Sequence, residues 1–248
     1  QRWVREQGWS NLREVQQKAV LHLAGSNRDL LISATTAAGK TEAAFLPLLG
    51  STAGRQQAGV SILYVAPLKA LINDQYKRLG ELCEKMEIPV TRWHGDAPQG
   101  PKNAMLKNPS GVVLITPESI EAMFVRRPAS IEALFANLDA IIIDELHAFL
   151  QGARGLHLSS LLHRIELLNE QRPQRVGLSA TLGDVEYAAE WLSSTAELGA
   201  EILKVEGKGP ALKLQIRSYI DPPTEDVDAA ILVEEDPKDA LSQIADHA

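Results

Sequence analysis

The sequence predicts an α/β domain built on a mainly parallel sheet with helices on both faces. Three short runs are almost entirely apolar instead of alternating with polar residues, which is typical of buried parallel strands. They are residues 60–65, 112–115 and 140–143. Helical patterns separate these runs, at about 68–86, 118–125 and 131–137. Buried strands that alternate with helices indicate a sheet covered on both sides.

Further elements follow in chain order. An amphipathic helix is expected over about 12–23, with Ser10 or Asn11 as its N-cap. A second helix is expected from Thr41 to Leu49, where Pro47 predicts an end or a kink. Three more strands are expected, one beginning at Leu30 and the others at 175–179 and 201–205, and a last helix begins near Asp184.

The composition is ordinary for a globular chain, with 45% hydrophobic and 23% charged residues among 248. No apolar run approaches the roughly 20 residues that span a bilayer, and the N-terminus lacks the apolar core of a signal peptide. We therefore expect a cytoplasmic protein with no membrane partner. Cys83 is the single cysteine, which excludes disulfides within the chain and a cysteine-based metal cluster.

The net charge of −7 is concentrated near the C-terminus. Nine of the 32 acids and one of the 25 bases lie from Asp221 onward, which leaves 23 acids and 24 bases in residues 1–220. A nearly neutral body does not indicate a broad basic surface, yet it allows a narrow track of phosphate contacts.

A phosphate-binding loop is indicated by the pattern Ala34-x-x-x-x-Gly39-Lys40-Thr41 after an apolar run. Backbone N–H groups of such a loop and of the next helix bind phosphate oxygens. Lys40 would reach the β- and γ-phosphates of ATP, and Thr41 would offer its hydroxyl to Mg²⁺. An Ala-rich strand-to-helix turn is the alternative. The expected nucleotide-binding residues of the loop are Thr36, Ala37, Ala38, Gly39, Lys40, Thr41 and Glu42.

A second cluster, Asp144-Glu145-Leu146-His147, follows the apolar run 140–143. Asp144 would hold Mg²⁺, directly or through water, between the β- and γ-phosphates. Glu145 would orient the attacking water as general base. A solvated acidic turn is the alternative.

Together these motifs resemble the superfamily 2 helicases of the DExH type, which implies a RecA-like P-loop NTPase domain. Other blocks match that family in order, at 66–71, 116–119 and 179–181. Gln16 is similar to the family's adenine-reading glutamine. Within the superfamily the chain resembles the Lhr-like (long helicase-related) group through the strings 36–47, 95–99, 154–158 and 175–184.

The resemblance implies further roles. Loops at one sheet edge would contact a nucleic-acid strand, DNA more than RNA, through Pro67, Lys69, Gly95, Asp96, Thr116, Pro117 and Glu118. Ser179 and Thr181 would couple the part of the site that binds the γ-phosphate to the part that contacts the nucleic-acid strand. Alternatively, they are turn residues that cap the helix near Asp184. His147 would sense nucleotide and link it to a partner domain.

The expected organisation is a helical segment at 1–28, a RecA-like ATPase domain at 29–210, and a linker with the truncated start of a second RecA-like domain at 211–248. We expect the first motor domain of an ATP-dependent helicase, with the second domain missing from this chain. Two alternatives stay open: a double-strand DNA translocase or remodeller that does not unwind, and an ATP-switched assembly module of a larger machine.

Overall fold

The computed structural model describes residues 11–35, 38–55, 58–180, 182–193 and 199–205. The chain divides into two units, residues 1–207 and 208–248. The expected linker and truncated start of a second domain, at 211–248, lie outside the described residues. Within the described part, no helix is long and apolar enough to cross a membrane.

A seven-stranded sheet organises the described residues, and every pair of neighbouring strands is parallel. The strand order is β3-β4-β2-β5-β6-β1-β7. The strands are β1 Leu30–Ala34, β2 Ile62–Val65, β3 Val90–Trp93, β4 Val112–Ile115, β5 Ala140–Ile143, β6 Gln174–Ser179 and β7 Glu201–Val205. The predicted parallel α/β sheet is confirmed.

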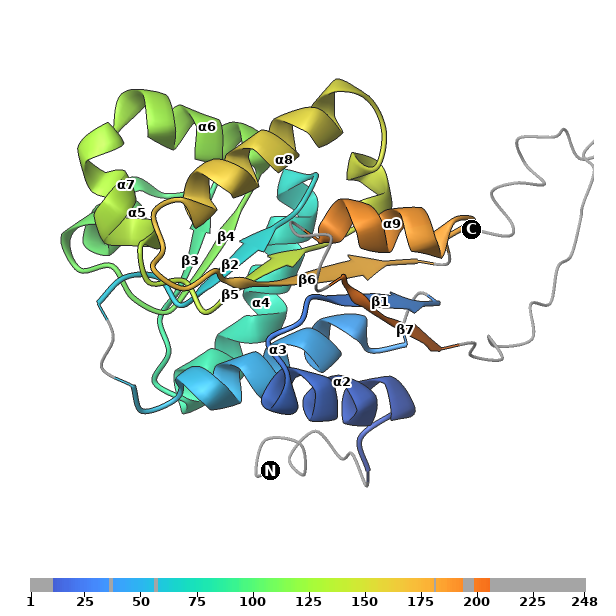
Figure 1. The fold of residues 1–248 in the computed structure, drawn as a ribbon. Helices are drawn as coiled ribbons and strands as arrows, with labels where there is room; N and C mark the ends of the chain where they lie inside the picture. The colour runs from blue at the N-terminus through green and yellow to red at the C-terminus, as the bar shows by residue number, and fades with distance from the viewer. Residues whose placement is uncertain (1–10, 36–37, 56–57, 181, 194–198, 206–248) are drawn as a thin grey trace, which may run out of the picture. The chain divides into compact units, whose positions relative to one another are not determined.

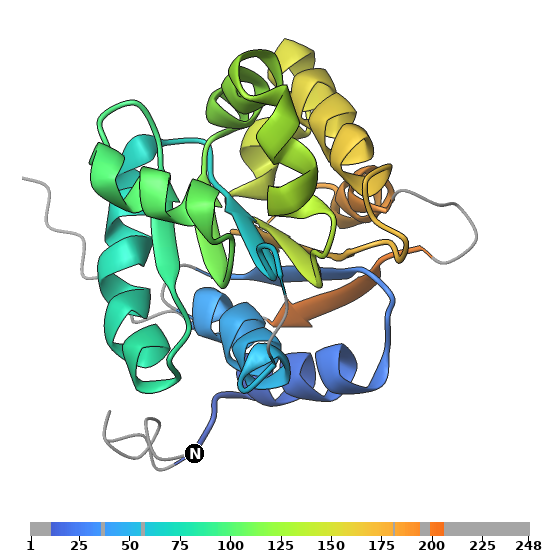
Figure 2. The same cartoon turned by 90° about the vertical axis from the view of Figure 1, so that its left-hand side faces the viewer.

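Helices cover both faces of the sheet (Figures 1 and 2). One face packs against α2 (Glu14–Gly25), α3 (Lys40–Thr52) and α4 (Lys69–Lys85). The other packs against α5 (Gln99–Lys107), α6 (Pro117–Arg126), α7 (Pro128–Phe135), the 3₁₀ turn η1 (Leu146–Phe149), α8 (Gly152–Glu166) and α9 (Val185–Leu192). Strands β2, β4 and β5 are buried along their whole length, as their apolar sequences require.

The sequence does not predict β3, α5, η1 or α8. β3 alternates between half-buried and buried residues because it is an edge strand, so it lacks a continuous apolar run. α5 has two buried residues, Lys102 and Met105, among nine, and this is too few for a clear apolar stripe.

Three helices differ from the expectation in their limits. α7 begins at Pro128 and ends at Phe135, against the expected 131–137. α2 begins at Glu14 with Arg13 as its N-cap, three residues after Ser10 and two after Asn11. The Gln16 side chain accepts a hydrogen bond from the Arg13 N–H at 3.0 Å, which closes the helix start there. α3 continues through Pro47 to Thr52, and the loss of one backbone donor is tolerated because this helix buries apolar side chains on both sides of the proline.

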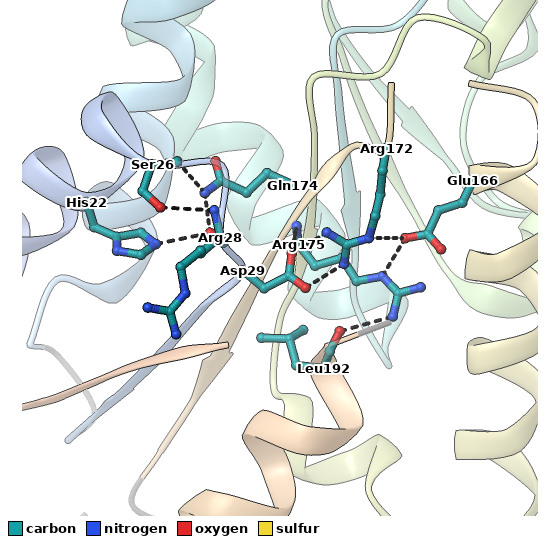
Figure 3. A network of polar contacts seen from close by, with 9 residues as sticks. All are labelled: His22, Ser26, Arg28, Asp29, Glu166, Arg172, Gln174, Arg175 and Leu192. Atoms are coloured by element: carbon teal, nitrogen blue, oxygen red, sulfur yellow. Dashed lines mark hydrogen bonds and ion pairs between the residues drawn. The ribbon is translucent and has the colours of Figure 1, made fainter. Parts of the chain in front are cut away.

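A buried network of ion pairs and hydrogen bonds lies at the amino edge of the sheet (Figure 3). Asp29 is 2% exposed and accepts hydrogen bonds from the guanidinium of Arg172 and from the Arg175 N–H. Arg175 also donates to Glu166 at 2.9 Å and to the Leu192 carbonyl at 3.0 Å. These contacts join the starts of β1 and β6 to the ends of α8 and α9, far along the strands from their carboxyl ends.

Candidate functional site

The strand order divides the carboxyl edge of the sheet into two halves. The loops after β1, β6 and β5 carry the phosphate-binding pattern, the 179–181 block and the acidic pair. The loops after β2, β4 and β3 carry the residues expected to contact a nucleic-acid strand, which are 67–69, 116–118 and 95–96 respectively. Ligands of open parallel sheets bind at carboxyl ends. The structure therefore brings the described members of these three groups and of the strand-contact loops to one edge, and β6 lies between β1 and β5.

The phosphate loop has the backbone that its glycine predicts. Gly39 adopts φ +86°, a conformation that favours glycine, and a Cβ there would lie 2.7 Å from Gln16 Nε2. The Lys40 ammonium donates to the carbonyl oxygens of Ala34 and Thr35 at 2.7 and 3.1 Å. Burial lowers the pKa of Lys40, and the carboxylates of Glu145 and Asp144 oppose that shift. Thr36 and Ala37 lie outside the described residues.

Gln16 is fully buried against this loop. Its Oε1 accepts from the Arg13 N–H, whereas its Nε2 has no hydrogen-bond partner among the described residues. A buried amide without a partner costs free energy, so such groups are usually completed by a ligand or water. The position of Gln16 beside Gly39 suits a residue that belongs to the nucleotide site.

The carboxylate of Asp144 is held on both of its oxygens. Oδ1 accepts from the Glu145 N–H at 3.0 Å, and Oδ2 accepts a hydrogen bond from the Tyr64 hydroxyl. Burial raises the pKa of Asp144, whereas the hydrogen bond from Tyr64 opposes this shift. Burial and the Asp144 carboxylate raise the pKa of Tyr64 far above its usual value, so its hydroxyl stays a donor.

Glu145 and His147 connect the acidic pair to the end of β6. Glu145 has φ +48°, which is uncommon for a residue with a side chain and is found at functional sites. His147 Nδ1 lies 3.3 Å from Glu145 Oε2 and 3.2 Å from Ser179 Oγ. The Ser179 hydroxyl therefore contacts His147, and the side chain that caps α9 is that of Asp184. Thr181 lies outside the described residues.

The oxygen donors at this edge fit Mg²⁺. The described residues contain no group of three or more His, Cys, Asp or Glu side chains able to hold a metal. Mg²⁺ beside nucleotide phosphates needs only one or two protein oxygens, because phosphates and water supply the others. The Asp144 carboxylate and the Thr41 hydroxyl are such oxygens, and Gln75 Nε2 lies 3.5 Å from Thr41 Oγ1.

In the other half of the edge, ion pairs join the loops. Lys69 Nζ lies 2.8 Å from Asp96 Oδ2, and this pair bridges the loops after β2 and β3. Arg154 donates to the Pro67 carbonyl at 2.6 Å and to Glu118 Oε1 at 2.9 Å, which bridges the loops after β2 and β4. Both carboxylates, of Asp96 and of Glu118, are therefore paired with a cation.

Not every strand-contact candidate faces solvent. Thr116 is 6% exposed, and its hydroxyl caps α6 by accepting from the Ser119 N–H at 3.4 Å. Pro67 and Pro117 are buried, whereas Lys69, Gly95, Asp96 and Glu118 are exposed. The expected residues are thus neighbours, but the buried ones contribute through loop geometry and backbone groups.

A cationic cavity that the sequence did not predict lies beside these loops. A cavity of about 260 Å³ is lined by Lys102, Arg126 and Arg127 together with His94, Gln99 and Ser119, and no acid is among its described lining residues. Lys102 is 5% exposed and donates to the His94 carbonyl at 2.7 Å. No carboxylate of the described residues pairs with Arg126 or Arg127. The adjacent arginines were the available sequence signal.

Known proteins resemble this chain in sequence and fold. The family model of the DEAD/DEAH box helicases matches residues 13–188. The Lhr helicase of Mycolicibacterium smegmatis is 35% identical over 67% of this chain and 12% of its own length. The ATP-dependent helicase Lhr-Core of Methanothermobacter thermautotrophicus is 31% identical over 77% of this chain and 24% of its own length. The chain thus spans about an eighth to a quarter of these relatives.

A solved structure agrees. The Mycobacterium smegmatis helicase Lhr bound to single-stranded DNA and AMP-PNP superposes with a TM-score of 0.71 at 32% identity, over 82% of this chain and 27% of that one. The fold is therefore that of a RecA-like helicase domain, and the expected likeness to the Lhr group is confirmed. On the family match and the shared fold together, this chain belongs to the DEAD/DEAH box helicases.

Proposed function

We propose that this chain is the first ATP-binding motor domain of an ATP-dependent helicase that couples hydrolysis of MgATP to movement on a nucleic-acid strand. The observation that carries the proposal is the division of one sheet edge into a phosphate-loop half and a strand-contact half, joined where β2 pairs with β5. The M. smegmatis relative, bound to single-stranded DNA and AMP-PNP, supports DNA as the strand and ATP as the nucleotide.

Each residue of the nucleotide half has a chemical role in this proposal. Lys40 would exchange the Ala34 and Thr35 carbonyls for the β- and γ-phosphates, since anionic oxygens are stronger partners for an ammonium. Asp144 and Thr41 would hold Mg²⁺, which neutralises charge on the phosphates. Glu145 would orient the attacking water, with His147 on its carboxylate. Gln16 would read the adenine.

In the half of the edge that is proposed to contact nucleic acid, the exposed groups of 67–69, 95–96 and 116–118 would hold phosphates without reading bases. The cavity lined by Lys102, Arg126 and Arg127 would extend that track with positive charge. Ser179 and Thr181 would couple the halves, through His147 in the case of Ser179.

A second RecA-like domain completes the proposed motor. In phosphoryl transfer an arginine supplied by a partner raises the rate about 10³–10⁵-fold. The proposal places that arginine and the rest of the nucleic-acid groove in the second RecA-like domain, and it places the protein in the cytoplasm. The likeness to helicases at 31–35% identity favours this function over a non-unwinding remodeller or an assembly module.

Two variants test the nucleotide half. Lys40→Ala removes the ammonium and is expected to abolish productive ATP binding in a titration with a fluorescent ATP analogue. Glu145→Gln keeps the shape of the side chain and is expected to leave binding intact while stopping turnover. Lys107→Ala, an exposed lysine at the far end of α5, is the control. Equal turnover by Glu145→Gln and the unaltered protein contradicts the general-base role.

Salt dependence tests the strand half. When a protein binds single-stranded nucleic acid, a plot of log affinity against log salt has a negative slope. Each phosphate contact that is lost makes that slope shallower by about 0.7. The double variant Arg126→Gln/Arg127→Gln is expected to lower both affinity and slope for oligo-dT, whereas Lys107→Gln has the slope of the unaltered protein. An unchanged slope in the double variant removes the cavity from the proposed strand track.

A further inference from the structure

Tyr64 is buried at the boundary between the two halves of the sheet. It lies in β2 opposite Ile142 of β5 and is 0% exposed. Its ring packs against Phe45, with 5.7 Å between the ring centroids. The surrounding cluster of β1, β2, β4, β5 and β6 side chains is apolar. The hydroxyl is thus a polar group in an apolar layer, where it needs a hydrogen-bond partner.

That partner is the carboxylate of Asp144. The Tyr64 hydroxyl donates to Oδ2, while the Glu145 N–H donates to Oδ1 at 3.0 Å. One donor comes from the neighbouring strand and the other from the same turn, so together they fix the rotation of the carboxylate about its last bond. A carboxylate has about four lone-pair sites. Two sites are used by these donors, and the rest are left for a metal or its water.

We propose that Tyr64 is a positioning residue that holds the Asp144 carboxylate in the orientation that binds Mg²⁺ beside the nucleotide. This inference rests on the proposed function, because the magnesium site belongs to it. Mg²⁺ demands near-ideal octahedral geometry. Residues that orient metal ligands typically change metal affinity about 10–100-fold when they are removed.

The competing explanation is that Tyr64 only fills the layer between sheet and helices, with Asp144 satisfying its hydroxyl. Tyr64→Phe separates the two, since it removes one oxygen and keeps the ring that packs against Phe45. Tyr76→Phe is the matched control. It removes one hydroxyl from α4, the helix that follows β2, at a partly exposed tyrosine whose ring lies under Arg92.

The experiment uses the 248-residue chain and N-methylanthraniloyl-ATP. Nucleotide affinity is measured by fluorescence in EDTA and then as a function of MgCl₂. The expected result is that Tyr64→Phe has the EDTA affinity of the unaltered chain within about twofold and needs about tenfold more Mg²⁺ for half of the magnesium-dependent gain. Tyr76→Phe is expected to match the unaltered chain in both measurements.

The outcomes separate the inference from the proposed function. If the unaltered chain gains affinity with Mg²⁺ and Tyr64→Phe has the same half-saturating Mg²⁺, the positioning role is wrong and the proposed site stands. If Tyr64→Phe loses affinity in EDTA as well, its role is general packing, and the inference is again wrong. If the unaltered chain does not respond to Mg²⁺, the proposed magnesium site and this inference fail together.

Discussion

His147 Nδ1 lies 3.2 Å from Ser179 Oγ, so the turn after β5 is joined to the end of β6. The same ring nitrogen lies 3.3 Å from Glu145 Oε2. Glu145 is the proposed general base and Ser179 begins the block expected to couple nucleotide to strand. Movement of either residue therefore changes the contacts of the other through one imidazole.

We expect His147→Ala to uncouple hydrolysis from the strand. ATP affinity should stay within about twofold, because the phosphate loop is untouched, while strand-stimulated turnover in the complete motor should fall about tenfold, a coupling loss of about 1.4 kcal/mol. His163→Ala, an exposed histidine on α8, is the control. The ratio of turnover with and without oligo-dT checks this, and an unchanged ratio contradicts it.

Arg154 is expected to set strand affinity without touching nucleotide. It holds the Pro67 carbonyl and Glu118, and its guanidinium lies 5.4 Å from the Phe149 ring centroid. Arg154→Met keeps the aliphatic stem but frees both loops, so affinity for oligo-dT should fall about tenfold, or about 1.4 kcal/mol.

Arg164→Met is the matched control for Arg154. Arg164 also lies on α8, pairs with a glutamate of α6 at 2.9 Å and stacks on the ring of Phe124, but it holds neither loop. Its variant should bind oligo-dT within about twofold of the unaltered protein. Equal losses in the two variants indicate a general effect of the α6–α8 contact and contradict the loop-holding role.

Asp29 is expected to stabilise the fold and leave the site alone. Its carboxylate pairs with Arg172 and caps the Arg175 N–H at the amino edge (Figure 3). Removing one partner of a buried ion pair leaves an unpaired charge, so Asp29→Asn should lower the free energy of unfolding by about 3 kcal/mol. Urea unfolding measures this, with exposed Glu190→Gln as control. A loss of unfolding free energy below about 1 kcal/mol contradicts the stabilising role of Asp29 in this network.

Asp139 gives a prediction with pH. Burial raises its pKa more than the ion pair with Arg55 lowers it, and its Oδ2 has no hydrogen-bond partner among the described residues. A raised pKa in the folded state means that the protonated side chain favours folding at low pH, and that this stability is lost as pH rises through the folded pKa.

The neutral variant Asp139→Asn should therefore raise the melting temperature at pH 7 relative to the unaltered chain. The difference should disappear below the ordinary aspartate pKa of about 3.9. Asp96→Asn should instead lower the melting temperature at pH 7, because the hydrogen bond from Lys69 lowers the pKa of Asp96 and so stabilises its charged form in the folded state. A lower melting temperature for Asp139→Asn at pH 7 contradicts this account.

The sequence predicts the parts of the site that depend on a few consecutive residues. Gly39-Lys40-Thr41 and Asp144-Glu145 follow apolar strands, so their place at a carboxyl edge follows from the parallel sheet. Continuous apolar runs also identify β2, β4 and β5 within two residues of their limits. These features need no knowledge of which strands are neighbours.

The remaining features depend on contacts between distant segments. Tyr64 meets Asp144 across 80 residues, and Arg154 meets Pro67 across 87. Nothing local in the sequence distinguishes Tyr64 from an ordinary core residue or Arg154 from a surface charge. The order of the β-strands is equally non-local, and it alone shows that the residues proposed to bind nucleotide and those proposed to contact nucleic acid lie in separate halves of one edge.

The most direct test of the central claim is steady-state ATP hydrolysis, measured for this chain and for a protein that also contains the proposed second motor domain. Each is assayed alone and with single-stranded DNA, single-stranded RNA and duplex, with Lys40→Ala as control. We expect this chain to be nearly silent and the two-domain protein to be stimulated many-fold, most by single-stranded DNA. If this chain alone hydrolyses ATP at the two-domain rate, or if every polymer is without effect, the account of a divided motor is wrong.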